Sequence, residues 1–515
     1  MTARRIGLFL GPLVFAITML TPAPAGMNAE SWLVAGLVIW MATWWMTEAI
    51  PLTATALLPF IWLPLGGVMS ARDAASAYYA PILFLLLGGA FIALAIERTG
   101  LHKRLSLAIL KTIGTGGGQT RLLLAFMMSA AILSMLISNT STALIMMPMA
   151  LAVLSGGAPL SGADRSSDRP LAAATRALHP STRSLPGYNP GGRVEDAGGP
   201  GASESEPRQE GINAALPMGI AFAATIGGLG TIVGSPTNGI AVALLDSMIG
   251  LEISFARWMA FGLPIVIIGV PLAAFIISRV QNIAAHSFDI EAARAAIDDH
   301  APWSPAEKRL VPVVAVTFFL WTTRLWLAPY LPENSWTDGT IAVIASLALF
   351  LLPDGTGRPL LVWQEANRAP WDVIMMFGGG LALAAGMQAS GLAEWLGNAL
   401  LPLETVPLVL MALAIVAMVV LITEFASNVA TASAVIPVVA SLAAALGLGE
   451  QAILIAMPAA LAASWGFILP AGTGPNAIAW STGRLRIEKL VQAGIVLDII
   501  GIGMIVGMVW MIASI

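Results

Sequence analysis

Apolar segments long enough to cross a lipid bilayer recur along this chain. Clear examples lie at residues 31–47, 258–278, 310–328 and 490–513. About 20 apolar residues in a helix span roughly 30 Å of hydrocarbon, and a backbone in lipid must form all its hydrogen bonds internally. Charged residues make up only 10% of the chain, against about a quarter in soluble proteins. The sequence therefore predicts an all-α polytopic membrane protein with one transmembrane domain, residues 1–515, embedded in the lipid bilayer.

Several function classes are disfavoured by what the chain lacks. It has no cysteine, so disulfides and thiolate metal sites are excluded. No HExxH or GxSxG motif is present, which disfavours a membrane-embedded enzyme. No basic patch suggests a nucleic-acid partner. The four histidines all fall in segments that we predict to be loops, namely His102, His179, His286 and His300.

Residues 155–211 interrupt the apolar pattern. They are rich in glycine, proline, serine and charged residues and have no apolar periodicity, a composition typical of flexible segments. We predict a flexible cytoplasmic loop here, with a regulatory site as the alternative.

Sequence motifs recur in the same order in the two halves of the chain. Ser138 begins SNTSTALIMMP, and Ser427 begins SNVATASAVIP 289 positions later. Downstream, GSPTNGIA in the first half is matched by GTGPNAIA in the second, and the smaller offset of 238 reflects the loop inserted in the first half. Such symmetry is typical of transporters built from two repeats, in contrast to channels. We assign the repeat cores to residues 81–245 and 372–480.

The distribution of basic residues indicates the orientation of the chain. With the N-terminus inside and about eleven crossings, nearly all lysines and arginines lie on the cytoplasmic side, as the positive-inside rule requires. Arg4 and Arg5 precede an apolar segment that also fits a signal peptide, but a first transmembrane helix agrees with this orientation. We therefore predict a multi-pass protein of the cell inner (plasma) membrane, with a cytoplasmic N-terminus and an external C-terminus. The basic residues left outside are Arg72, Arg257 and Arg324.

Each repeat core contains a predicted hairpin, at residues 118–154 and 406–440. The segment 98–121 is basic, whereas its counterpart at 390–405 has no lysine or arginine, so we predict that the two repeats are inverted. Charge alone does not decide whether a hairpin crosses the membrane fully or re-enters, because in both cases the chain returns to the side from which it entered. We favour re-entrant hairpins, since the Ser-Asn motif would lie at a tip within the membrane, where irregular backbone is tolerated only inside protein or along a cavity.

Oxygen atoms gather around each Ser-Asn motif. Ser134 and Thr423 each stand four residues before the motif serine, which places two oxygens on one helix face. The GSPTN and GTGPN segments contain glycine and proline, which unwind a helix and free carbonyl oxygens. Such neutral oxygen ligands suit a small monovalent cation, so we predict two Na+ sites, one in each half. For Thr142 and Thr431 we expect ordinary hydrogen bonds to their own backbone or to a neighbouring helix.

An anion is the expected second ligand. Helix N-termini at the hairpin tips present unpaired N–H groups and the positive end of the helix dipole. No lysine or arginine lies near either Ser-Asn motif in the sequence. We therefore expect a small anionic substrate to be held by asparagine amides, backbone N–H groups and bound Na+ rather than by a salt bridge.

The motifs together resemble those of the divalent anion/sodium symporter family, which includes sodium-dependent dicarboxylate and citrate transporters. The resemblance rests on WWMTEAIPLTATALLP, the two Ser-Asn motifs, TEFASNVATASAVIP and PAGTGPNAIAWSTGRL, and it covers nearly the whole chain except the loop at 155–211. It implies an elevator-type transporter that forms a homodimer. It also implies that two or more Na+ ions drive uptake of a C4-dicarboxylate such as succinate, malate or fumarate, of citrate, or of sulfate.

The resemblance assigns candidate residues to these ligands. One sodium site would use Ser134, Ser138, Asn139 and Gly234, and the other Thr423, Ala426, Asn428 and Gly472. Substrate carboxylates would contact Asn139, Thr140, Asn428 and Thr473. Two positions depart from the family pattern: Val429 replaces a hydroxyl residue expected to face substrate, and Gly474 stands where proline is common. The first departure leaves the identity of the substrate open.

The main alternative within transport is a proton-coupled carrier or an exchanger. Glu48 and Glu424 are the acidic residues nearest the apolar core, and carboxyl groups inside a membrane are functional candidates. Both lie near predicted helix ends, where a capping role is equally expected.

Overall fold

The computed structural model describes residues 3–113, 118–156, 210–285 and 302–514. The loop predicted at 155–211 therefore lies almost entirely outside the described residues.

All regular structure in the described ranges is helical. The first half of the chain contains α1 (Ala3–Leu20), α2 (Ala29–Thr47), α3 (Leu52–Thr55), α4 (Leu58–Leu65), α5 (Ala71–Ala77), α6 (Pro81–Thr99), α7 (Leu101–Ile113), α8 (Gln119–Ser134), α9 (Asn139–Gly156), α11 (Ile212–Gly228), α12 (Pro236–Ile249) and α13 (Phe255–Val280). The second half contains α15 (Pro305–Leu327), α16 (Asp338–Leu351), α17 (Trp363–Ala366), α18 (Trp371–Ala389), α19 (Leu392–Leu400), α20 (Leu408–Phe425), α21 (Asn428–Ala445), α22 (Ile453–Ala462), α23 (Gly474–Ser481) and α24 (Ile487–Ala513).

Seven helices in the described part of the chain are long and apolar enough to cross a membrane. They are α6, α13, α15, α18, α20, α21 and α24. Shorter apolar helices, α8, α9 and α11 among them, accompany these seven. At 1.5 Å per residue, the 16 residues of α8 reach only about 24 Å, less than the roughly 30 Å of a bilayer core. The all-helical membrane fold expected from the apolar segments is confirmed, while the expected eleven crossings stay a prediction.

The order of helices in the first half recurs in the second. The series α6, α7, α8, α9, α11, α12 corresponds to α18, α19, α20, α21, α22, α23. The turn between the first two helices of each series even has the same backbone geometry. Gly100 and Gly391 both adopt left-handed conformations, with φ of 79° and 80°, which glycine adopts without steric cost.

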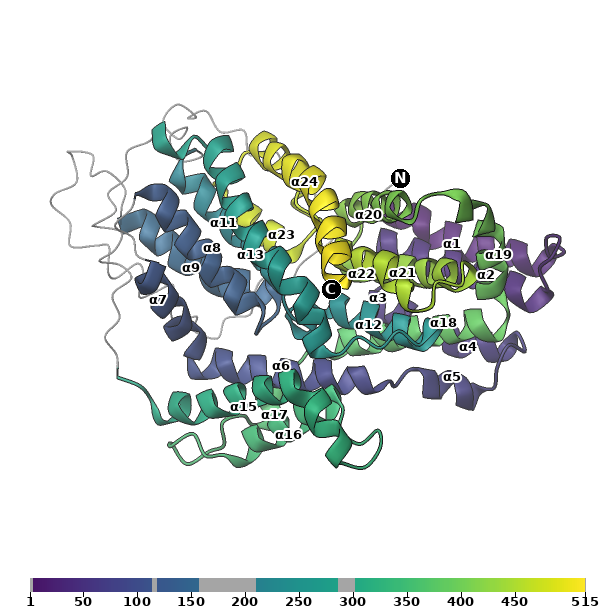
Figure 1. The fold of residues 1–515 in the computed structure, drawn as a ribbon, viewed down its shortest axis with the longest axis horizontal. Coiled ribbons are helices and arrows are strands. Elements are labelled where there is room, and N and C mark those ends of the chain that lie inside the picture. Colours follow the sequence, from purple (N-terminus) through teal and green to yellow (C-terminus); the bar gives the residue numbers. More distant parts are fainter. Residues whose placement is uncertain (1–2, 114–117, 157–209, 286–301, 515) are drawn as a thin grey trace.

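Figure 1 shows how the two series are arranged. In this view α7, α8, α9 and α11 lie at one end of the molecule and α18, α19, α21 and α22 toward the other, with α6, α15 and α16 along one side. Helix α12 of the first series packs against α18 and α21 of the second, and α23 of the second packs against α9 and α11 of the first. Because each series contributes a helix to the other, residues of both halves meet in the middle.

One of the histidines expected in loops lies elsewhere. His102 belongs to α7 and is only 4% exposed, with its Nδ1 atom 3.1 Å from the carbonyl oxygen of Ile96. Burial lowers the pKa of its imidazole, which favours the neutral ring at pH 7. The loop prediction was wrong because α7 is amphipathic and follows α6 after a single glycine turn, so its polar residues looked like a connection. The other three histidines lie outside the described residues.

Candidate functional site

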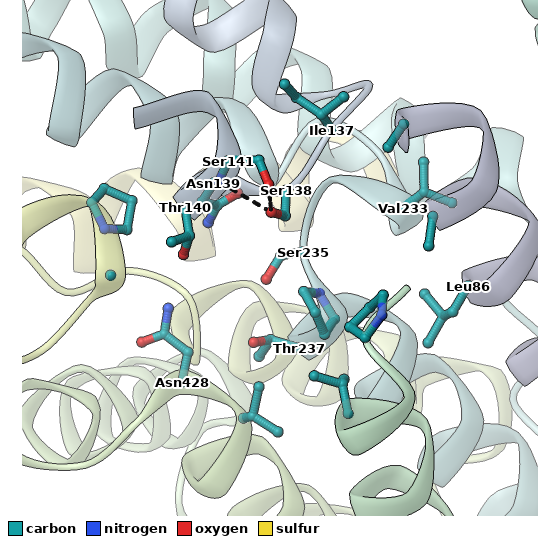
Figure 2. Close-up of a pocket in the computed structure, with 18 of the residues that line it drawn as sticks. Leu86, Ile137, Ser138, Asn139, Thr140, Ser141, Val233, Ser235, Thr237 and Asn428 are labelled. Carbon is teal, nitrogen blue, oxygen red and sulfur yellow. Dashed lines mark hydrogen bonds between the residues drawn. The ribbon is translucent and has the colours of Figure 1, made fainter. Parts of the chain in front are cut away.

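A cavity of about 470 Å³ lies where the two series of helices meet. Both Ser-Asn motifs contribute to its wall. In Figure 2, Thr140 and Asn428 extend into the same space from opposite sides. The sequence-predicted residues that line it are Ser138, Asn139, Thr140, Asn428, Val429, Gly472 and Thr473.

Four helices begin at this cavity. The first residues of α9 and α21 carry the motif asparagines, Ser235 and Pro236 begin α12, and Thr473 caps α23 by accepting a hydrogen bond from Asn476 N at 3.3 Å. The first N–H groups of a helix have no partner within the helix, and its dipole is positive at this end. Four N-termini around one cavity therefore make it a favourable place for an anion.

An oxygen cluster lies behind the cavity at the end of α8. The Ser134 hydroxyl is 2.9 Å from Asn139 Oδ1 and 2.6 Å from the carbonyl oxygen of Ala224. A serine hydroxyl has a single hydrogen to donate, yet both neighbours are acceptors. We call these three atoms the first oxygen cluster (Ser134 Oγ, Asn139 Oδ1, Ala224 O). It has one hydroxyl hydrogen for two neighbouring acceptor oxygens, and such an excess of acceptors is typical of a cation site.

The second half repeats this geometry. The Thr423 hydroxyl is 2.9 Å from Asn428 Oδ1 and 2.8 Å from the carbonyl oxygen of Ala463. Ala426 ends α20 in an extended conformation, with φ of −124° and ψ of 159°, so the chain leaves the helix at the residue whose carbonyl is a candidate ligand. The second oxygen cluster (Thr423 Oγ1, Asn428 Oδ1, Ala463 O) and the first each lie at the C-terminal end of a helix, where the dipole favours cations.

The remaining candidate ligands lie beside these clusters. Gly234 packs so closely that an added Cβ would be 2.8 Å from the carbonyl oxygen of Ser134. Gly472 lies next to the residue after Thr423, because an added Cβ would be 3.4 Å from the Glu424 carbonyl oxygen. Both glycines belong to the stretches that separate α11 from α12 and α22 from α23. Ser138, the last residue of the first predicted set, lines the cavity instead, and its hydroxyl donates to that of Ser141 at 3.0 Å.

Two asparagines absent from the sequence prediction hold these helix breaks. The Asn238 amide nitrogen donates to the carbonyl oxygens of Gly228 and Thr231 at 2.7 and 2.8 Å, and that of Asn476 donates to Leu469 O at 3.2 Å. The repeated PTN and GPN segments contained this signal, since the two asparagines are 238 residues apart like the rest of the downstream match.

Buried oxygen atoms without partners occur in symmetric pairs. The pairs are Thr142 with Thr431, Thr225 with Ser464, and Asn238 with Asn476, and within the described structure none of the six side-chain oxygens has a hydrogen-bond partner. Leaving a buried polar atom unpaired costs about 1–3 kcal/mol. The expectation of ordinary hydrogen bonds for Thr142 and Thr431 was therefore wrong. Thr142 and Thr431 are 0% and 1% exposed, so neither hydroxyl reaches solvent.

A glycine missed by the sequence prediction determines the position of Asn139. Gly228 ends α11, and a Cβ built on it would lie 2.0 Å from Asn139 Oδ1. Real Cβ atoms essentially never come within 3.0 Å of another heavy atom, so only glycine lets the amide reach the first oxygen cluster. No local pattern reveals this, because the two residues are far apart in the sequence.

One basic residue does reach the cavity, contrary to expectation. Arg368 lines its wall together with Glu97, to which it forms an ion pair of 3.0 Å. The Arg368 side chain is 62% exposed. It lies 60 positions before Asn428 in the sequence, in the short connection between α17 and α18. The expectation that no lysine or arginine lies near the motifs is correct for the sequence, but in the folded chain Arg368 lines the same cavity as the motifs.

Neither acidic residue of the proton-coupled alternative lines the cavity. Glu48 is exposed and caps α2 in a left-handed conformation. Glu424 is 3% exposed and accepts hydrogen bonds of 2.5–3.0 Å from the backbone N–H groups of Phe467, Ile468 and Leu469. Its carboxylate therefore fixes the chain between α22 and α23.

Three comparisons with known proteins bear on this site. Residues 3–514 match the family described as "Sodium:sulfate symporter transmembrane region". The chain is 36% identical to a protein of Staphylococcus saprophyticus named sodium-dependent dicarboxylate transporter SdcS, over 98% of this chain and 90% of that protein. It is 34% identical to the protein of the same name from Staphylococcus aureus, over 100% and 92% of the two chains. Among solved structures, the YdaH transporter of Alcanivorax borkumensis has a similar fold, with a TM-score of 0.50, 13% identity and coverage of 100% of this chain and 98% of that one.

Proposed function

Since this chain belongs to the sodium:sulfate symporter family, and is therefore a membrane transporter and not an enzyme, we propose that it couples Na+ entry to uptake of a di- or tricarboxylate of the succinate, malate, fumarate or citrate class. The names of the staphylococcal relatives support a sodium-dependent dicarboxylate carrier. The observation that carries the proposal is the arrangement at the cavity. Four helix N-termini meet at the cavity, and an oxygen cluster lies behind each motif asparagine.

In this proposal each asparagine serves two ligands. Asn139 and Asn428 turn their Oδ1 atoms toward the oxygen clusters, which leaves their amide N–H groups for substrate carboxylates. Two or more Na+ ions neutralise the dianion at short range. Binding of cation and anion is then strongly coupled, because either alone leaves an uncompensated charge in a low-dielectric site. As the family resemblance implies, the carrier would act as a homodimer and move its substrate by an elevator motion.

A test is uptake of radiolabelled succinate into proteoliposomes under an inward Na+ gradient. We expect uptake to cease when choline replaces Na+ at clamped pH, and to be competed by malate or citrate. Uptake driven by a pH gradient without Na+ would favour the proton-coupled alternative. Strict dependence on internal dicarboxylate would indicate an exchanger. Competition by sulfate alone would move the substrate class from carboxylates to sulfate.

Val429 makes the cavity chemically unequal on its two sides. Thr140 offers a hydroxyl from the first motif, whereas Val429 offers methyl groups from the second, and both line the cavity. We predict that Val429→Thr, a nearly isosteric change, shifts the ratio of apparent affinities among succinate, citrate and sulfate by at least about threefold, because a hydrogen bond to a carboxylate contributes about 1.5–3 kcal/mol when well aligned. Competition assays in the same liposomes would show this, and an unchanged ranking would mean that Val429 does not contact substrate.

Arg368 is expected to attract the substrate to the cavity. We predict that Arg368→Gln weakens the apparent affinity for succinate by up to about fivefold at low ionic strength, since exposed ion pairs contribute about 0.2–1 kcal/mol. The effect should shrink at high salt because of screening. Glu97→Gln should have the opposite effect, because it frees Arg368. Arg358→Gln is the matched control: Arg358 pairs with Glu365 at 2.6 Å and does not line the cavity. Equal effects of both arginine changes would contradict the prediction.

A further inference from the structure

A buried carboxyl group in the middle of α24 lacks any visible compensation. Asp498 is 4% exposed, and neither of its carboxyl oxygens accepts a hydrogen bond from a donor group among the described residues. Helix α24 is one of the seven candidate membrane spans. Burying an ionised carboxylate without partners in such surroundings is very unfavourable. A ligand that supplies positive charge would remove this cost.

A second carboxyl group lies beside it. The Asp498 side chain interacts with that of Glu424 at the end of α20. Close packing on the same face of α24 accounts for this approach: an added Cβ at Gly494 would lie 2.6 Å from Phe467 O, and one at Gly501 would lie 2.1 Å from Trp465 Nε1. Residues four before and three after Asp498 share its helix face. Asp498 thus faces the chain segment whose N–H groups hold Glu424.

No basic side chain of the described helices compensates these two acids. The helices packed against α24 are α13, α20 and α22, and α20 and α22 contain no lysine or arginine. The basic residues of α13 and α24 lie near helix ends and are engaged there. Arg257 donates to Glu252 O at 3.0 Å, Arg279 lies 5.0 Å from the centre of the Phe275 ring, and Lys489 donates to Val280 O at 2.8 Å.

A further oxygen without a partner belongs to the same region. Ser464 is fully buried, and its hydroxyl has no hydrogen-bond partner in the described structure. It directly follows Ala463, whose carbonyl oxygen contacts Thr423 at 2.8 Å. Thr423 in turn precedes Glu424. Ser464 therefore adds a buried hydroxyl to the stretch between α22 and α23 whose backbone N–H groups hold Glu424.

We propose that Asp498 and Glu424 bind a further Na+ ion, with the Ser464 hydroxyl as an additional oxygen ligand. Asp498 supplies two carboxylate oxygens with no other partner, while Glu424 keeps lone pairs beyond those that accept backbone N–H groups. The transport consequence rests on the proposed function. Three Na+ ions carried with one dianion would move one net positive charge across the membrane in each transport cycle. Uptake would therefore respond to membrane potential.

The test compares Asp498→Asn, which keeps the size of the side chain and removes its charge, with the unaltered protein. Equilibrium binding of radioactive Na+ to purified protein should fall by one ion per chain in the variant. In proteoliposomes, the number of Na+ ions moved per succinate should also fall by one, and stimulation by an inside-negative potential should be lost. Asp246→Asn is the control, because Asp246 is an exposed acid on α12, and it should behave like the unaltered protein.

The outcomes separate this site from the proposed function. An unchanged number of bound Na+ ions in folded Asp498→Asn would overturn the site, and so would loss of a coupled proton instead of a Na+ ion. Should that variant not fold, Asp498→Ser provides a second neutral substitution for the same binding measurement. Absence of Na+-driven succinate uptake in the unaltered protein would count against the proposed function alone, since Na+ binding still decides whether Asp498 holds an ion.

Discussion

Replacing Asn139 or Asn428 with alanine is expected to abolish Na+-driven uptake. Each amide oxygen lies 2.9 Å from the hydroxyl of its oxygen cluster, and each side chain lines the cavity. Truncation removes a ligand of Na+ and a donor to substrate together. Hydrogen bonds to charged groups contribute about 1.5–3 kcal/mol each, so the loss of two such interactions should lower transport efficiency by about 100-fold or more.

Uptake of succinate in proteoliposomes measures this effect, and size-exclusion chromatography with thermal unfolding checks that the variants fold. Asn398→Ala is a matched control, because Asn398 is exposed on α19 and lines a separate cavity of about 350 Å³. Near-normal transport by either folded motif variant would show that its asparagine is not shared by the two ligands. A loss confined to one half would mean that the two oxygen clusters are not equivalent.

Gly228→Ala is expected to be nearly as damaging, although Gly228 does not line the cavity. Its new methyl group would lie 2.0 Å from Asn139 Oδ1 and 2.8 Å from Asn139 Cγ. The amide must withdraw by about 1 Å, which separates it from Ser134. Overpacking of this kind costs typically 1–3 kcal/mol. We expect loss of about one bound Na+ per chain and a fall in uptake of roughly 100-fold, because the same two interactions are lost as in Asn139→Ala.

Two other glycines serve as controls for this prediction. Gly466 lies in the corresponding stretch of the second half, but an added Cβ there would be 3.1 Å from both Glu424 Oε1 and Thr423 Cγ2. Small shifts relieve such contacts, so Gly466→Ala should reduce uptake by less than about tenfold. Gly503→Ala meets no atom within 4 Å and should leave uptake unchanged. Equal activity of Gly228→Ala and Gly503→Ala would show that Asn139 tolerates displacement.

Much of the candidate site was predictable because it is encoded locally and twice. The Ser-Asn motifs, the hydroxyls four residues earlier and the glycine-rich helix breaks are short patterns, and their repetition at fixed offsets separates them from chance. The comparable hydroxyl contacts of Ser134 and Thr423, at 2.9 Å in both halves, follow from that repetition. Asn238 and Asn476 form a repeated pair of the same kind, but their role depends on carbonyl groups of the unwound segments, which the sequence does not place.

The amino-acid sequence alone determined that the chain is a helical membrane protein, that its halves repeat, and which short motifs carry oxygen ligands. These properties depend on residues close together in the chain, where helix periodicity and hydrophobicity act. Only the tertiary structure decided that Arg368 reaches the cavity, that Gly228 makes room for Asn139, and that Asp498 faces Glu424. Such contacts join residues from different helices. Their distances depend on how whole helices pack, and no local pattern of side chains contains that information.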